Sequence, residues 1–240
     1  IGVTGVQTCA LPIWRQLHLH RPAFDAHGCL TDSFGERGVG MAGAGDVFRR
    51  RAELHGDADG FAMRTRMVEV IFNMDPGQAV SYNDYRGVYI LMERIKRSKD
   101  RVNIAKLTDL VTDPTLITGG YIFRRDRASS DGTTQLPVGM NSHTPGVLNA
   151  AQTTYLSNHI NAFNTALYSA NFTDPVLGYA PYIDVNSFIE NWWFVEITKQ
   201  IDGYRLSTYF TKDRGGKITA TPIWDYNLSL GNADYATGDQ

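Results

Sequence analysis

The spacing of the apolar residues changes once along this chain, and that change restricts the fold more than any other feature. Three early runs are rich in β-branched and aromatic residues: 67–73, 85–94 and 119–125. Runs of this kind predict strands, and we expect the first two to pair. Four later residues recur at helical spacing: Leu156, Ile160, Phe163 and Leu167. They predict an amphipathic helix over 149–169.

A second helix is expected to begin with Asp184 or Asn186 as its N-cap and to run to Ile201. Seven apolar residues cover nearly all sides of it: Phe188, Ile189, Trp192, Trp193, Phe194, Val195 and Ile197. The pattern therefore predicts a buried central helix, which ends at the pair Asp202-Gly203.

Two further segments complete the expected architecture. Residues 206–223 read as a hairpin around a Gly-Gly turn, whereas the Ser-, Gly- and Thr-rich segment 128–141 reads as a loop. The order of elements predicts one α+β domain with a strand-rich front and a helical rear.

Composition places the chain among soluble globular proteins. It has 240 residues, 42% of them hydrophobic, and a formal net charge of only −2. This balance does not favour nucleic acid or a membrane surface as a partner, and the basic runs at 94–101 and 124–127 are expected to be solvated. No run approaches the ~20 apolar residues that a membrane span requires.

The first sixty residues differ from the rest. Residues 3–13 resemble the translation of a sequencing adapter, so we expect 1–13 to be an artefact. Residues 14–62 show no strand or helix period, and are either out of frame or a disordered leader. Both cysteines, Cys9 and Cys29, lie in this part, which leaves 63–240 as a domain without disulfide chemistry.

Two aspartates stand where phosphoryl-transfer chemistry would need them. Asp202 follows the second helix, and Asp225 follows the hairpin that can return the chain to the same place. Helix, Asp, polar residue, hairpin and Asp is also the order of the catalytic and metal-binding segments of protein kinases, with Ser207 as the polar residue. Alternatively, Asp202 only ends a helix.

Five blocks carry a resemblance to a known family: YRGVYILMERIK (85–96), GGYIF (119–123), GYAPYIDVNSFIENWW (178–193), EITKQIDGYRLSTYFTKD (196–213) and GGKITATPIWDYNLSLGNADY (215–235). Together they resemble the CotH family of atypical kinases, known from spore coats and bacterial extracytoplasmic proteins. The resemblance implies an atypical protein-kinase-like fold, here with an incomplete N-terminal lobe.

The resemblance also implies roles for five residues. Asp202 would be the catalytic carboxylate and Asp225 a Mg²⁺ ligand, with Ser207 and Asn227 as polar partners near the metal or phosphates. Glu93 would line the nucleotide pocket, unless it forms a structural salt bridge.

Further phosphate contacts remain open at two lysines. Lys199 and Lys212 either contact phosphates or are simply solvated. The triplet Gly215-Gly216-Lys217 lacks the context of a phosphate-binding loop and is expected to be a turn.

By this resemblance the function is ATP- and Mg²⁺-dependent phosphoryl transfer to Ser or Thr of a protein, outside the cytoplasm or on the spore surface. Activity is expected to be impaired, because a phosphate-covering loop and its lysine are not found before residue 63. One alternative is an inactive surface or coat protein that binds a partner. Another is metal-dependent phosphoester hydrolysis.

Overall fold

The computed structural model describes residues 62–74, 77–127 and 132–233, which form two compact units. The first unit contains the described residues from 64 to 94, and the second contains residues 62–63 and those from 95 onward. The adapter-like segment 1–13 and nearly all of the segment 14–62 lie outside the described residues.

The first unit is an antiparallel hairpin. Strand β1 (Thr65–Ile71) pairs with β2 (Tyr85–Met92), with Met67 opposite Ile90, as the apolar runs predicted. The short 3₁₀ helix η2 (Tyr82–Asp84) precedes β2. At the open end of the hairpin, the Arg64 side chain donates to the Glu93 carboxylate at 2.6 Å.

The second unit contains a five-stranded antiparallel sheet in the order β4-β5-β3-β6-β7. Its strands are β3 (Tyr121–Arg125), β4 (Gln135–Leu136), β5 (Met140–Thr144), β6 (Thr208–Lys212) and β7 (Ile218–Thr219). Three short 3₁₀ helices accompany them: η3 (Leu116–Thr118) precedes β3, η4 (Pro137–Gly139) joins β4 to β5, and η5 (Tyr226–Leu228) follows β7. The expected α+β class is confirmed, and so is the hairpin of β6 and β7.

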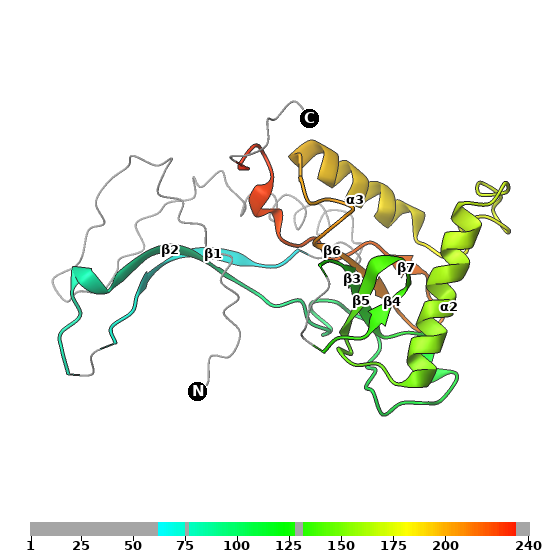
Figure 1. The fold of residues 1–240 in the computed structure, drawn as a ribbon, viewed down its shortest axis with the longest axis horizontal. Coiled ribbons are helices and arrows are strands. Elements are labelled where there is room, and N and C mark those ends of the chain that lie inside the picture. The colour runs from blue at the N-terminus through cyan, green and yellow to red at the C-terminus, as the bar shows by residue number, and fades with distance from the viewer. Residues whose placement is uncertain (1–61, 75–76, 128–131, 234–240) are drawn as a thin grey trace. The chain divides into compact units, whose positions relative to one another are not determined.

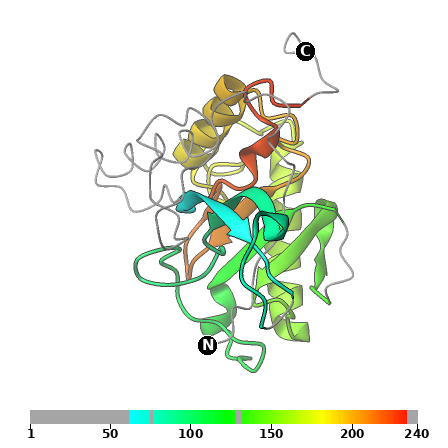
Figure 2. The same ribbon diagram turned by 90° about the vertical axis from the view of Figure 1, so that its left-hand side faces the viewer.

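Two helices pack on one face of this sheet (Figures 1 and 2). Helix α2 (Ala150–Leu167) begins at Asn149, whose side chain accepts from the Gln152 amide. Helix α3 (Val185–Thr198) begins at Asp184, one of the two expected N-caps. None of the helices in the described part of the chain is both long and apolar enough to cross a membrane.

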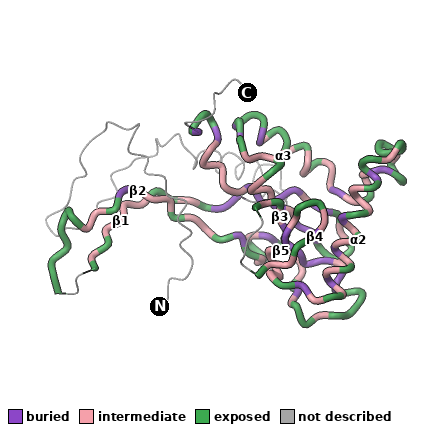
Figure 3. Tube along the Cα trace, viewed as in Figure 1, coloured by how far each residue is buried: buried purple, intermediate pink, exposed green. Residues whose placement is uncertain are grey.

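Strand β3 separates two apolar clusters, because its side chains alternate between the two faces of the sheet. Tyr121 and Phe123 join Leu156 and Ile160 of α2 in the larger cluster. Ile122 points to the other face and joins a smaller cluster of Met63, Ile95, Val102 and Tyr209. Figure 3 shows the buried residues of this unit concentrated around the sheet.

The expected loop at 128–141 is wrong over its second half. Residues 128–131 lie outside the described part, but β4, η4 and the start of β5 occupy 135–141. Strand β5 has the sequence Met-Asn-Ser-His-Thr and therefore lacks an apolar period. It is a strand because its main chain pairs with both β3 and β4.

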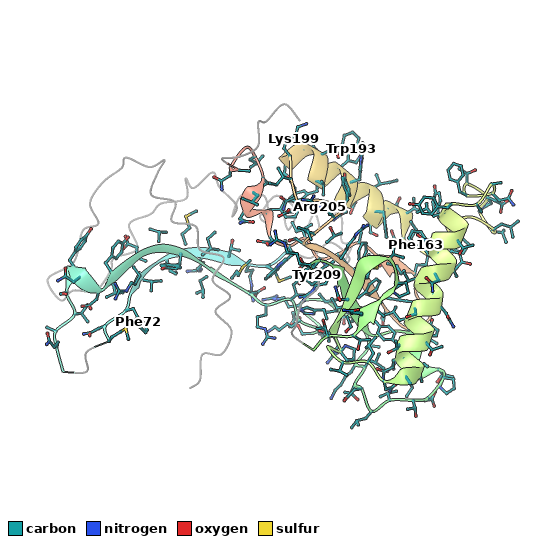
Figure 4. All side chains as sticks on the ribbon, in the orientation of Figure 1. Phe72, Phe163, Trp193, Lys199, Arg205 and Tyr209 are labelled. Atoms are coloured by element: carbon teal, nitrogen blue, oxygen red, sulfur yellow. The ribbon has the colours of Figure 1, made fainter. Side chains whose placement is uncertain are left out.

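The prediction of a buried central helix is also wrong. Only Val195 and Thr198 of α3 are buried, whereas Trp193 is 52% exposed and Ile197 is 69% exposed. Figure 4 shows Trp193 on the outer side of α3. The helix packs against the rest of its unit along one stripe. Among the described residues, the apolar side chains outside that stripe face solvent.

Candidate active site

The end of α3 places the first candidate aspartate. Lys199 adopts a left-handed backbone with φ of 53°, and its amide donates to the Glu196 carbonyl at 3.3 Å. The next amide, of Gln200, donates to the Val195 carbonyl at 3.1 Å. These two bonds form a Schellman motif, which ends the helix at Thr198 rather than at Ile201. Asp202 therefore lies on the loop after the helix.

A tight turn connects Asp202 to β6. The Asp202 carbonyl accepts from the Leu206 amide at 2.8 Å. Ser207 then takes a left-handed backbone with φ of 52° before β6 begins at Thr208. Because Arg125 of β3 lies opposite Thr208, continuing the register one step places Asp126 opposite Ser207.

Asp225 follows β7, the second strand of the hairpin. Its backbone is also left-handed, with φ of 63° and ψ of 50°. The Ser207 hydroxyl donates to its carboxylate at 3.3 Å, and the Gln200 side-chain amide donates to its backbone carbonyl at 2.7 Å. The loop after α3 and the segment after β7 are thus joined at Asp225.

These segments enclose a pocket of about 290 Å³. Its lining residues are Asp126, Arg127, Asp202, Leu206, Ser207, Asp225, Asn227 and Leu228. Four of the five residues selected from the sequence therefore lie at one pocket, although they come from two separate parts of the chain.

The Asp225 carboxyl is in an unfavourable place for a negative charge. Burial raises its pKa above the ordinary value, and the neighbouring carboxylates of Asp202 and Asp126 raise it further. The hydrogen bond from Ser207 acts in the opposite direction and lowers the pKa. A cation in this pocket would offset both the cost of burying the Asp225 charge and the repulsion from the neighbouring carboxylates.

Among the described residues, neither candidate aspartate is buried against an arginine. The Asp202 carboxylate lies 3.9 Å from Arg205, and that arginine side chain is 74% exposed. An exposed pair at this distance is weak. The carboxylate of Asp202 is thus available to the pocket.

The residues present fit a magnesium ion in the chemistry of their donors. Aspartate, serine and asparagine side chains supply the oxygen atoms that Mg²⁺ prefers, and Mg²⁺ commonly binds one or two carboxylates together with phosphates and water. Among residues 62–74, 77–127 and 132–233, no three His, Cys, Asp or Glu side chains form a ready-made metal centre. The pocket therefore fits a magnesium ion whose remaining coordination positions are filled by a bound ligand or water.

Three other sequence candidates are not among the lining residues named above. Glu93 belongs to the hairpin unit and pairs with Arg64, as its structural alternative proposed, and a role in nucleotide binding stays a prediction. Lys199 is exposed at the end of α3 (Figure 4). Lys212 is 1% exposed and donates to the backbone carbonyls of Thr118 and Gly216, so the expectation of a solvated or phosphate-binding lysine is wrong there.

Two charged lining residues of the pocket were not selected from the sequence. Asp126 and Arg127 belong to a basic run that was expected to be a solvated face, yet both line the pocket. Arg124 contacts the Asp126 carboxylate at 3.9 Å and donates to the Tyr209 hydroxyl at 3.2 Å. The missed signal was their position directly after a central strand, beside the predicted hairpin.

A family model described as CotH kinase protein matches residues 51–240. No curated protein matches the chain.

Proposed function

Because this chain belongs to the CotH kinase family, we propose that it transfers the γ-phosphoryl group of ATP to a Ser or Thr hydroxyl of a protein. The observation that carries this proposal is the shared pocket of Asp202 and Asp225. Phosphoryl transfer depends chiefly on placing the reacting groups and neutralising the phosphates, and paired carboxylates can orient the acceptor hydroxyl and hold the cation that neutralises the charge.

Asp202 is proposed as the residue that orients the acceptor hydroxyl. Its carboxylate lines the pocket, keeps 19% of its surface exposed and has only a weak arginine contact. A carboxylate in this state accepts a hydrogen bond from the attacking hydroxyl and takes up its proton during transfer.

Asp225 is proposed as the principal cation ligand, with Ser207 and Asn227 beside it. Asp225 is the more buried carboxylate, and its charge lacks a cationic partner that would lower its pKa. A magnesium ion bound there would neutralise negative charge on the phosphates of ATP. Arg127 is the positively charged residue among the described residues that line the pocket, and its guanidinium suits phosphate oxygen atoms.

Thermal unfolding with ATP and MgCl₂ tests the binding half of this proposal. Mg²⁺ and ATP together should raise the unfolding temperature of the full chain, and ATP with EDTA should not. At a ligand concentration 100 times Kd the stabilisation would be about 2.7 kcal/mol. Asp109→Asn, which changes an exposed carboxylate away from the pocket lining, is the matched control and should respond like the wild type.

The reaction itself is tested with radiolabelled ATP and dephosphorylated casein as a general acceptor. Label on casein Ser or Thr supports the kinase, whereas release of phosphate without an acceptor supports hydrolysis. A chain that shows neither stabilisation by Mg²⁺ and ATP nor transfer would leave partner binding on an inactive scaffold as the function. The natural acceptor, by family resemblance a surface or coat protein outside the cytoplasm, stays a prediction.

A further inference from the structure

Gln200 is a buried amide that links the two aspartate-bearing segments. Its residue is only 7% exposed, and its backbone is fixed by the Schellman motif and by the Gly203 amide, which donates to its carbonyl at 3.1 Å. Its side-chain nitrogen donates to the Asp225 carbonyl at 2.7 Å. A rigid helix end thus reaches across to the chain around Asp225.

The orientation of this amide is determined by its partner. A backbone carbonyl can only accept, so the nitrogen of Gln200 must face Asp225 and the oxygen must point away. That oxygen is buried without a protein hydrogen-bond partner among the described residues. Gln200 lines a small cavity of about 10 Å³ together with Asn191 and Thr208, which gives room for about one water molecule beside them.

Asp225 needs such support because little else fixes it. Its left-handed backbone is unfavourable for a residue with a Cβ atom. The side-chain contact that favours its charge is the 3.3 Å bond from Ser207, which is long for a hydroxyl donor. The 2.7 Å bond from Gln200 is the shorter of the two.

We propose that Gln200 is a positioning residue, whose bond to the Asp225 carbonyl holds that backbone in its left-handed form and so aims the Asp225 carboxylate into the pocket. The functional half of this inference rests on the proposed function. Groups that orient a metal ligand commonly change metal affinity by about 10- to 100-fold when they are replaced.

Gln200→Met tests this, because methionine keeps the length of the side chain and removes the donor. The matched control is Gln152→Met. Gln152 is also fully buried and its amide donates to two backbone carbonyls, of Thr108 and Val111, but it does not line the pocket. Both variants are expected to lose stability, so stability alone does not decide the question.

Hydrogen exchange measures the positioning directly in the full chain. Gln200→Met should speed exchange of the amides at 225–229 about tenfold under native conditions, and Gln152→Met should leave them unchanged. Unchanged exchange at 225–229 in Gln200→Met would overturn the inference.

Titration with MgCl₂ at saturating ATP measures the functional consequence. The Mg²⁺ concentration for half-maximal thermal stabilisation should rise about tenfold in Gln200→Met and stay at the wild-type value in Gln152→Met. Faster exchange with an unchanged Mg²⁺ requirement would also overturn the inference, because Gln200 would then be merely structural. A wild type that does not respond to Mg²⁺ and ATP contradicts the proposed function, a result that the exchange data distinguish from a failure of the Gln200 bond.

Discussion

Asp202 and Asp225 share a pocket but differ in their surroundings, and this difference predicts separable effects of mutation. Asp202→Asn should lower kcat by about 10²- to 10⁴-fold with little change in KM for ATP, because only the group that orients the hydroxyl is lost. Asp225→Asn should instead abolish the Mg²⁺-dependent stabilisation by ATP, because the buried carboxylate is lost. Steady-state kinetics and thermal unfolding measure the two effects.

The control for both variants is Asp109→Asn, whose carboxylate is exposed and outside the pocket lining. It should match the wild type in both measurements. The assignment of roles is contradicted if Asp202→Asn removes the response to Mg²⁺ and ATP while Asp225→Asn retains it.

The sequence predicted the pocket residues in the two blocks that contain Asp202 and Asp225, but missed the charged residues whose position depends on strand register. Ser207, Asp202, Asp225 and Asn227 stand within long motif-like blocks, so the resemblance selected them. Asp126 reaches the pocket because β3 lies beside β6, and a pairing between residues about 85 apart leaves no local mark on the sequence. Whether each selected residue has its assigned chemical role stays a prediction.

Among the elements, the junction between α3 and the Asp202 loop leaves no room for an added side chain. A Cβ atom at Gly203 would lie 2.4 Å from the Cγ1 atom of Val195, a buried and β-branched residue of α3. Gly203→Ala should therefore reduce the free energy of unfolding by about 1–3 kcal/mol, measured by urea denaturation. Gly146→Ala is the control, because its Cβ would meet nothing nearer than 3.8 Å.

A double-mutant cycle identifies the cause of that loss. In a Val195→Ala background the clashing methyl group is absent, so Gly203→Ala should cost clearly less than in the wild type. Equal costs in the two backgrounds would mean that the close contact with Val195 is not the reason.

Elements with a clear period were predicted better than those formed by long-range pairing. Helix α2, its start at Asn149 and the pairing of β1 with β2 follow from local spacing. Strand β5 has no apolar period and exists because of its neighbours, and α3 has more apolar residues than its one packed stripe can bury. The apolar composition of α3 therefore did not predict how many sides of the helix pack against other elements.

At the level of the whole molecule, Lys212 should make stability depend on pH. Burial lowers its pKa below the ordinary value of 10.5. Between the lowered value and 10.5 the unfolded chain binds a proton that the folded chain has released, so folding becomes more favourable as pH rises through this window. The free energy of unfolding of the wild type should therefore rise relative to that of Lys212→Met as the pH rises towards 10.5, as measured by urea denaturation.

The comparison with Lys212→Met cancels the titrations of Tyr121 and Tyr155, whose pKa values burial raises in both proteins. The titration of His159 does not cancel, because burial and then the charge of Lys212 lower its pKa. The two proteins are therefore compared above about pH 8, where this histidine is neutral in both. Lys212→Met also loses the two bonds to the Thr118 and Gly216 carbonyls, which lowers its stability at every pH. A difference between the proteins that stays constant with pH would contradict the prediction.

The overall class was predictable because it depends on the sum of many local patterns, whereas the sheet order was not. Strand-like runs followed by helical periods indicate α+β. The order β4-β5-β3-β6-β7 brings β3 next to β6 across a long stretch of sequence, and this choice depends on how both faces of β3 are covered.

The pocket residues are separate from the apolar clusters that cover the sheet, and this separation has a consequence for evolution. None of the eight pocket residues belongs to either apolar cluster, so a lineage can exchange its reactive groups by drift without unfolding. Relatives that keep the fold but have an inactive site are then expected. Ancestry and chemistry must accordingly be assessed separately in each descendant.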